Sequence, residues 1–258
     1  LTTSSFGIYA TLMSYLILGN VLLSYGMETA FFRFINKHAS KKEIVQSTAL
    51  SSLTVSTLVF TTALLLIREP LSSFLNFKVE YVVYAIGVLA LDALAVLPFV
   101  WLRANERPMK YAIIKIFSVS VNLGFNLFFF LILPKLAHND SDSLWGTIYS
   151  EENKIGYVFI SNLIASAISL LVLTPLYLKI GFKFNSLIWK QMIGYAFPVL
   201  IAGMAFSVNE AFDKILLAYL LPSDIASSQV GIYAACYKLG VFMTLFSTAF
   251  RLGIEPFF

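Results

Sequence analysis

The chain has 258 residues, of which 59% are hydrophobic and 12% are charged, and its mean hydropathy is +0.81. A soluble globular protein carries roughly 25% charged residues, so this composition indicates an integral membrane protein. The net charge of +4 is small and scattered, which argues against a nucleic-acid-binding protein. The single cysteine, Cys236, excludes a framework of intrachain disulfides.

Apolar segments that alternate with short polar connections fill the whole chain. A bilayer core needs about 20 apolar residues, and this criterion predicts seven transmembrane helices, at about 8–34, 44–67, 81–102, 111–133, 155–178, 191–221 and 231–257. The fold class is therefore an all-α polytopic membrane protein. The sequence starts without a methionine and stops inside a helical pattern, so we expect a fragment of a longer protein, with no cleavable signal peptide in view.

Basic residues concentrate in every second connection. One set of connections carries about ten of them, and the positive-inside bias places this set in the cytoplasm: Arg33, Lys37, Lys41, Lys42, Arg103, Arg107, Lys110, Lys179, Lys183 and Lys190. The opposite set carries only Arg68, Lys78, Lys135 and Lys154. The chain is thus predicted to begin outside, and the acidic loop 134–154 to face outward.

Two stretches of the sequence repeat one another. Gly7-Ile8-Tyr9-Ala10 opens the first predicted span, and Gly231-Ile232-Tyr233-Ala234 opens the seventh; each span closes on a Gly-x-Glu motif followed by phenylalanines. Copies six helices apart run in the same direction, which predicts parallel lobes of six helices around an axis along the membrane normal. We expect residues 1–185 to be an N-terminal lobe without its first helix, and 186–258 to begin a truncated C-terminal lobe. The whole protein should have twelve to fourteen transmembrane helices in two pseudo-symmetric lobes.

Polar residues form a stripe on the first predicted span. Asn20, Ser24 and Glu28 recur every four residues, which places them within about 80° on one helix face. Glu28 cannot reach out of the apolar layer as a lysine can, so we interpret it as functional. Arg33 lies off this stripe, near the cytoplasmic end, where it either anchors the helix or contributes to a site.

The seventh span carries a comparable stripe, formed by Thr244, Thr248, Arg251 and Glu255 within about 60°. Arg251 and Glu255 are spaced to pair, and a self-neutralised pair packed between helices is the alternative to a functional face. Lys238 lies about 120° off this stripe and could simply snorkel.

The sixth span is the most charged of the seven. Glu210 and Lys214 are spaced as i, i+4 partners, which leaves Asp213 as the unpaired acid and the better functional candidate. Pro198 precedes them in a span of about 31 residues, so the helix either bends there or is tilted.

The remaining polar residues inside the spans are interpreted as structural. Asp92 and Lys115 are predicted to form an ion pair between the third and fourth spans. Hydrogen bonds between helices are expected from Asn122, Asn126 and Asn162, and close helix packing from the Ser/Thr-rich second span.

No enzyme motif is present in the sequence. His38 and His138 lie in predicted loops, and no Cys/His metal cluster, Walker loop or GxSxG elbow occurs. We expect a protein that is not an enzyme and has no metal site or cofactor. Transport would then use an ion gradient or the gradient of the substrate, and Glu28, Asp213 and Glu255 are acids that could couple to H⁺ or Na⁺.

Three stretches of sequence resemble a known family. Residues 25–34, YGMETAFFRF, together with FDKILL at 212–217 and the stretch from Val230 to Phe258, resemble the polysaccharide flippases of the multidrug/oligosaccharidyl-lipid/polysaccharide exporter (MOP) superfamily, most closely its Bacteroidetes members. The resemblance covers the whole chain. It implies a MATE-like fold of two six-helix lobes around a central cavity, which agrees with the internal repeat.

The resemblance also implies a function. The substrate would be a polyprenyl-pyrophosphate-linked oligosaccharide, such as an O-antigen, capsule or exopolysaccharide repeat unit, moved from the inner to the outer leaflet of the bacterial inner membrane by alternating access. Expected partners are membrane lipid and the polymerase and glycosyltransferases of the same pathway. Cations that face the pyrophosphate would be Arg33, Lys214, Lys238 and Arg251.

Two other classes of protein compete with this interpretation. A cation-coupled multidrug exporter of the same superfamily would have a more acidic and less basic cavity. A seven-helix receptor or channel is disfavoured by the six-helix repeat.

Overall fold

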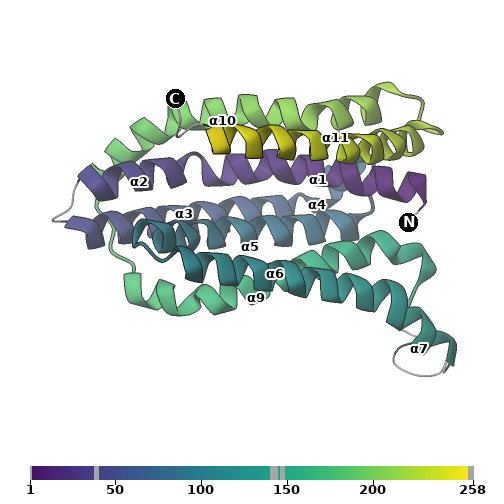
Figure 1. Cartoon of the computed structure of the whole chain (residues 1–258), viewed down its shortest axis with the longest axis horizontal. Helices are drawn as coiled ribbons and strands as arrows, with labels where there is room; N and C mark the ends of the chain where they lie inside the picture. The colour runs from purple at the N-terminus through teal and green to yellow at the C-terminus, as the bar shows by residue number, and fades with distance from the viewer. Residues whose placement is uncertain (1, 38–40, 140–144, 146–148, 255–258) are drawn as a thin grey trace. The chain divides into compact units, whose positions relative to one another are not determined.

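The structure is a computed structural model that describes residues 2–37, 41–139, 145 and 149–254, drawn in Figure 1. The described residues are 90% helical and contain no strand. The all-α prediction is therefore confirmed. The helices are α1 (Thr3–Ser24), α2 (Met27–Lys37), α3 (Lys42–Leu66), α4 (Arg68–Leu75), α5 (Val79–Ala104), α6 (Pro108–Leu127), α7 (Leu133–Asn139), α9 (Lys154–Ile180), α10 (Ser186–Leu220) and α11 (Ala226–Ile254), with a π-helical turn at Phe128–Ile132 and a 3₁₀ turn at Glu151–Asn153.

Six helical segments within the described residues are long and apolar enough to cross a membrane. They coincide with the first six predicted spans: Thr3–Lys37, Lys42–Leu66, Val79–Ala104, Pro108–Ala137, Lys154–Ile180 and Ser186–Leu220. The seventh predicted span corresponds to α11, a continuous helix of 29 residues that is not among the six. The prediction of a polytopic membrane protein is thus confirmed.

The first span is broken where α1 meets α2. Tyr25 has a φ of 34° and Gly26 a φ of 71°, both in the left-handed region that helices do not adopt. A Cβ on Gly26 would lie 2.5 Å from the main-chain oxygen of Ala196 in α10, so only glycine fits. The Tyr25 hydroxyl is fixed by a 2.8 Å hydrogen bond with Ser52 of α3. The break re-aims the helix directly before Glu28.

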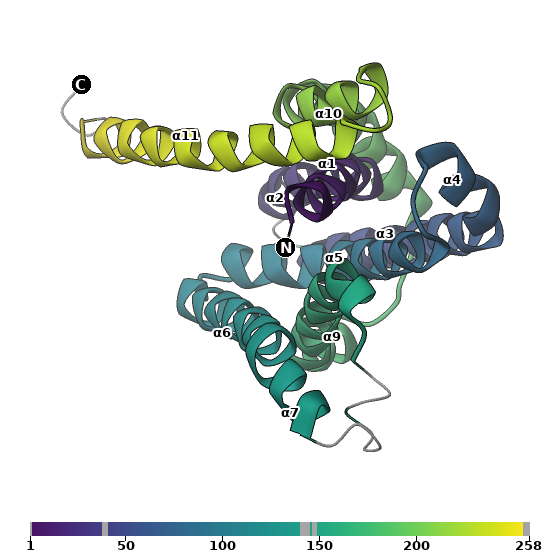
Figure 2. The same cartoon turned by 90° about the vertical axis from the view of Figure 1, so that its right-hand side faces the viewer.

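The helices divide into two compact units, which are described separately: Leu16–Asn209, and Leu1–Tyr15 together with Glu210–Phe258. In the larger unit, α5 is the central helix and packs against α2, α3, α4, α6 and α9, an arrangement that can be followed in Figure 2. Its apolar core joins α2, α3, α5, α9 and α10 through Phe31, Leu50, Leu53, Leu102, Leu173 and Met192. The predicted lobe boundary near residue 185 stays a prediction.

Small polar residues allow α3 to approach its neighbours closely, as the sequence predicts. Ser47, Thr48, Thr57 and Thr61 are buried. Thr61 donates its hydroxyl proton to the Thr57 carbonyl at 2.7 Å, which satisfies the hydroxyl without a partner on another helix. Small side chains of this kind are typical of helix contacts in membranes.

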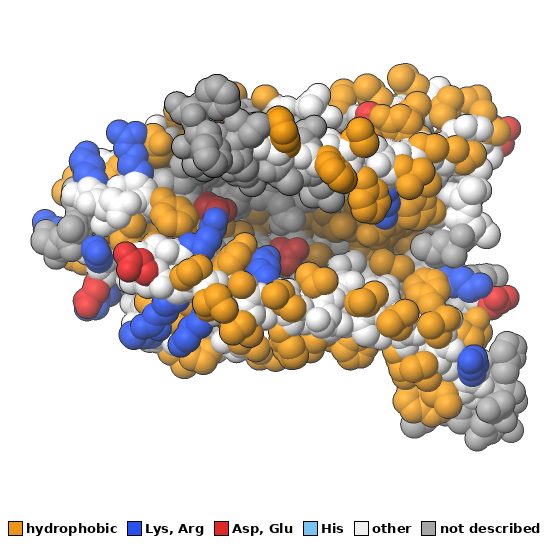
Figure 3. Space-filling view, in the orientation of Figure 1, with side chains coloured by type: hydrophobic (Ala, Val, Ile, Leu, Met, Phe, Trp, Pro, Cys, Tyr) orange, Lys and Arg blue, Asp and Glu red, His pale blue; other side chains and the backbone are white. Residues whose placement is uncertain are grey.

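The outer surface of the larger unit is apolar. No residue of α6 is buried, and Ile113, Ile116 and Val119 are 60%, 67% and 66% exposed. Figure 3 shows hydrophobic side chains along the helices, whereas basic side chains gather at the end where α5 passes into α6. An apolar belt with a basic end is the arrangement expected of a protein surrounded by lipid.

In the smaller unit, the two copies of the sequence repeat pack against each other. Figure 2 shows α11 crossing α1. Two side-chain hydrogen bonds join the helices, Ser4 to Ser227 at 2.7 Å and Thr3 to Ser228 at 3.1 Å. The repeat therefore corresponds to two helices that meet in the structure.

Candidate functional site

A polar cavity of about 450 Å³ lies inside the larger unit, between α1, α2, α5, α6 and α9. Every helix that surrounds it contributes at least one polar side chain. The residues that line it are Asn20, Val21, Ser24, Glu28, Asp92, Ala95, Val96, Phe99, Arg103, Tyr111, Lys115, Ser118, Ser166 and Ser169. We call it the α5 cavity, since α5 supplies the largest share of its wall.

The polar stripe predicted on the first span lines the α5 cavity. Asn20 and Ser24 come from α1, and Glu28 comes from the first turn of α2. All three side chains line the cavity, although the helix breaks between Ser24 and Glu28. The prediction that they share a face is confirmed, and this face looks into a cavity within the membrane-spanning part of the protein.

Glu28 forms an ion pair with Arg103, the last charged residue of α5, whose guanidinium donates to the carboxylate. The side chains are 41% and 38% exposed, so the pair is accessible from the cavity. The guanidinium also lies 5.4 Å from the ring centroids of both Phe32 and Tyr111. These rings favour a cation at this position by their negative faces.

Asp92 and Lys115 line the same cavity but do not form the predicted ion pair. The Asp92 carboxylate accepts a hydrogen bond of 2.6 Å from the Ser166 hydroxyl of α9. The Lys115 ammonium lies over the ring of Phe99, 4.4 Å from its centroid. No ion pair joins Asp92 to Lys115 among the described residues, although both side chains line the cavity.

Two acidic and two basic side chains therefore share the α5 cavity: Glu28, Asp92, Arg103 and Lys115. The intramembrane acids are costly in lipid, and the cavity provides each with a polar partner. Such a cavity can accept an ion or the charged part of a larger amphiphile.

Arg33 lies away from the α5 cavity, as its position off the stripe predicts. Its guanidinium stacks over the ring of Tyr195 in α10, 4.2 Å from the centroid, and its side chain is exposed. This contact ties α2 to α10 and does not bring Arg33 to the other charged residues of the cavity.

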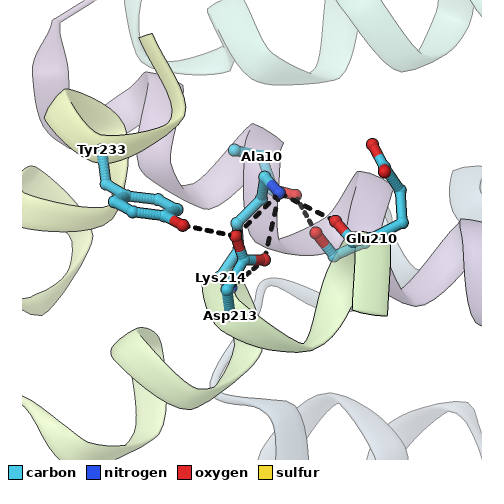
Figure 4. A network of polar contacts seen from close by, with 6 residues as sticks. Ala10, Glu210, Asp213, Lys214 and Tyr233 are labelled. Carbon is cyan, nitrogen blue, oxygen red and sulfur yellow. Dashed lines mark hydrogen bonds and ion pairs between the residues drawn. The ribbon is translucent and has the colours of Figure 1, made fainter. Parts of the chain in front are cut away.

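A second charged cluster lies in the smaller unit, where Figure 4 shows Lys214 reaching between Asp213 and Glu210. Lys214 is 9% exposed; its ammonium lies 3.1 Å from the Asp213 carboxylate and donates to the main-chain oxygen of Glu210 at 3.0 Å. It also lies over the ring of Tyr237, 3.9 Å from the centroid. The Tyr233 hydroxyl donates to Asp213 at 2.6 Å.

The predicted pairing in this cluster is wrong. Glu210 and Lys214 have the spacing of side-chain partners, but the ammonium turns to the carboxylate of its neighbour Asp213 and takes only the main-chain oxygen from Glu210. Asp213 is accordingly the paired acid. The sequence analysis did not consider the Tyr233 hydroxyl of α11, which is a second partner of Asp213.

The remaining candidates of the seventh span are only partly described. The Lys238 ammonium lies 4.7 Å from the ring centroid of Phe6 and 5.7 Å from that of Tyr9, both in α1. It therefore has aromatic partners and is more than a snorkelling residue. The side chains of Thr248 and Arg251, and Glu255 as a whole, lie outside the described residues, so the predicted stripe on this span stays a prediction.

Sequence reasoning missed two cationic members of the α5 cavity. Arg103 was assigned to a cytoplasmic connection by the positive-inside bias, and Lys115 to a structural pair. The available signal was spacing: Phe99 and Arg103 are four residues apart, as are Tyr111 and Lys115, so each pair occupies one helix face. The pattern of a basic residue one turn after an aromatic residue, near the end of a span, could have indicated that Arg103 and Lys115 belong to a site.

The fold and the α5 cavity define a multi-pass α-helical membrane protein with a polar, charge-lined interior. The chain belongs to the polysaccharide biosynthesis protein family, whose family model matches residues 1–250. This membership identifies it as a transporter related to polysaccharide synthesis and confirms the resemblance to the MOP-superfamily flippases. No curated protein and no solved structure matches the chain.

Proposed function

We propose that this protein is a flippase that moves a polyprenyl-pyrophosphate-linked oligosaccharide from the inner to the outer leaflet of the bacterial inner membrane. The observation that carries the proposal is the α5 cavity, a polar space within the membrane-spanning helices that holds Arg103 and Lys115. A headgroup that carries sugars and phosphates needs polar surroundings and fixed cations on its way through the apolar layer.

The balance of charges in the cavity supports this function over drug export. A cation-coupled multidrug exporter is expected to have an acidic cavity, because its usual substrates are cationic. The α5 cavity instead has as many basic as acidic residues among the described side chains that line it. An anionic substrate is the better match for such a wall.

Other charged residues complete the proposal. Four further cations, Lys214, Lys238, Arg33 and Arg251, are proposed to bind the substrate. Asp213 and Glu255 are proposed as further acids that couple transport to an ion. Glu28 or Asp92 would couple transport to H⁺ or Na⁺, since both are acids inside the membrane-spanning part. The polymerase and glycosyltransferases of the pathway would act on the same lipid-linked intermediate.

The test is complementation of a bacterial strain that lacks its polysaccharide flippase. The full-length protein should restore surface polysaccharide and should remove the lipid-linked intermediate that accumulates at the inner leaflet. The alternative, a cation-coupled multidrug exporter, is tested by measuring export of cationic dyes from the same cells. Restored dye efflux without restored polysaccharide would reject the flippase function in favour of drug export.

A further inference from the structure

We propose that Arg103 binds the diphosphate group of the substrate and that Glu28 is its resident counter-ion, which the diphosphate displaces on entry. The inference rests on the proposed function, because it names the residues that recognise the anionic part of that substrate. The sequence alone assigns these residues other roles: Arg103 as a positive-inside anchor and Glu28 as an isolated acid.

The geometry presents Arg103 to the cavity. Its guanidinium is the last cation of α5, lines the α5 cavity and is 38% exposed. The rings of Phe32 and Tyr111 lie at the same distance of 5.4 Å and hold the guanidinium between α2 and α6. An arginine fixed in this way has little freedom to lose when an anion binds, and its planar fork matches phosphate oxygens.

The Glu28 contact is suited to exchange. The carboxylate is 41% exposed and belongs to the pair that lies in the cavity wall. Ion pairs that remain in contact with water contribute little to stability, so exchange of this carboxylate for another anion costs little. A diphosphate carries more negative charge than a carboxylate and offers more oxygens for bidentate hydrogen bonds. The exchange therefore favours the diphosphate.

Lys115 supplies the second cation of the same site. Its ammonium is held over Phe99 in the cavity wall and has no carboxylate within ion-pair distance in the described residues. Tyr111, which contacts Arg103, lies one turn before Lys115 on α6, and its ring packs edge-on against Phe99 at 5.5 Å. The two cations are thus linked through one pair of rings.

The second acid of the cavity lies away from the proposed site. Asp92 precedes Arg103 by eleven residues, which is about 16 Å along a helix, and it is engaged by Ser166. Glu28 is therefore the acid that competes with an anion at Arg103. The removal of its charge is expected to strengthen anion binding.

The experiment measures binding to the purified full-length protein in detergent by isothermal titration calorimetry. The probes are a polyprenyl diphosphate, the corresponding polyprenol without phosphate, and inorganic pyrophosphate. Glu28→Gln should bind the polyprenyl diphosphate about fivefold more tightly than the parent at low salt, because a competing charge is lost. Arg103→Gln should bind it about tenfold more weakly.

The double variant Glu28→Gln/Arg103→Gln tests whether the two residues act at one place. It should bind like Arg103→Gln alone, because the counter-ion has no effect once its arginine is gone. Arg107→Gln is the matched control. Its guanidinium lies over Trp101 at 5.7 Å, outside the cavity wall, and the variant should bind like the parent. Polyprenol should not distinguish any of these variants.

Tighter binding by Glu28→Gln cannot result from misfolding, so it supports the inference directly. Equal or weaker binding by that variant overturns it, as does unchanged binding by Arg103→Gln. If only inorganic pyrophosphate follows the variant pattern, the site takes free diphosphate and its assignment to a lipid headgroup is wrong. Complementation by the parent alongside unchanged binding would reject this inference and leave the proposed function intact.

Discussion

Gly7 of α1 and Gly231 of α11 face each other where the two helices cross. A Cβ on Gly7 would lie 1.7 Å from the main-chain oxygen of Ser227, and a Cβ on Gly231 would lie 2.0 Å from that of Thr3. Ser227 precedes Gly231 by four residues, and Thr3 precedes Gly7 by four. The contact is therefore the same when viewed from either helix, which is the property of a two-fold crossing between repeated elements.

Replacement of Gly7 or Gly231 by alanine should separate the two helices. The added methyl group would overlap main-chain atoms, which cannot move aside as a flexible side chain does, so the helices must shift. We expect a loss of about 1–3 kcal/mol in stability for each variant. The measurement is the melting temperature of the detergent-solubilised protein, followed by fluorescence-detected size exclusion.

Gly240→Ala on α11 is the matched control for these variants. A Cβ at Gly240 meets no atom of the described residues within 4 Å, and alanine favours a helix over glycine by up to about 1 kcal/mol. This variant should be as stable as the parent or slightly more stable. Equal stability of Gly7→Ala and Gly240→Ala would show that the crossing is not close-packed.

Asp92→Asn should leave the protein folded but impair transport. The amide oxygen of the introduced side chain can still accept the hydrogen bond from Ser166, and no ion partner in the described structure is left without a counter-charge, since Lys115 lies over Phe99. The folded yield should stay near that of the parent, while removal of the acid from the α5 cavity should reduce translocation of the lipid-linked intermediate. Yield by size exclusion and complementation of polysaccharide synthesis measure the two effects.

The ion pair that the sequence predicts between Asp92 and Lys115 would give the opposite outcome. Asp92→Asn would then lower the folded yield, and a second substitution at Lys115 would restore it. The measured yield and activity of Asp92→Asn distinguish a functional acid from a structural ion pair. A fully active Asp92→Asn variant would show that this acid only packs in the wall, and a poorly folded variant would restore the ion-pair interpretation.

The positions of the helices could be predicted from the sequence, whereas the hydrogen-bond and ion-pair partners of their polar side chains were predicted less well. Span positions follow from hydropathy because lipid demands about 20 apolar residues whatever the fold is. The stripe of Asn20, Ser24 and Glu28 was also predictable, since residues four apart share a helix face. The break at Tyr25 and Gly26 was not, because its cause is the close approach of α10 to Gly26.

Charge partners depend on packing between helices that the sequence does not reveal. The spacing of Glu210 and Lys214 predicts a side-chain pair, but the Lys214 ammonium contacts the Asp213 carboxylate and only the main-chain oxygen of Glu210. The positive-inside bias assigns Arg103 to a cytoplasmic connection, and this assignment gives no indication that its side chain lines a cavity. A basic residue at the end of a span can therefore serve both as a positive-inside residue and as part of a cavity wall.

Lys214→Met should destabilise the smaller unit. The lysine is buried and is the counter-charge of Asp213, whose side chain is 28% exposed. In the variant, Asp213 would keep two hydrogen bonds, from the Tyr233 hydroxyl and from the main-chain N–H of residue 214, but no cation. Breaking a buried pair costs about 3–5 kcal/mol, and we expect about 1–3 here because Asp213 is partly exposed. Lys238→Met is the control, since Lys238 contacts only aromatic rings among its described partners. Melting temperatures that fall equally in both variants would contradict the pairing.

A double-mutant cycle should detect the hydrogen bond between α6 and α9. The Asn122 side chain donates to Asn162 at 2.6 Å, as the sequence analysis predicted for these asparagines. We expect a coupling energy of about 0.6–2 kcal/mol between Asn122→Ala and Asn162→Ala. The prediction of a bond between helices is wrong for Asn126, which in the described structure bonds only to Asn122 within its own helix. Its coupling with Asn162 should therefore be smaller. Equal coupling for both asparagines would contradict a direct bond.

The orientation of the protein in the membrane determines the direction in which a substrate enters the α5 cavity. Positive-inside counting places the α5–α6 connection, with Arg103 and Arg107, in the cytoplasm, and the α4–α5 connection outside. Single cysteines in place of Asn76 and Asn105, in a Cys236→Ser background, test this assignment in intact cells. An impermeant thiol reagent should label the cysteine at 76, and the one at 105 should react only after the membrane is permeabilised. The reverse pattern would place the Glu28–Arg103 pair at the outer face. A diphosphate lipid made in the cytoplasm would then meet Arg103 last rather than first, which would turn the proposed entry site into an exit site.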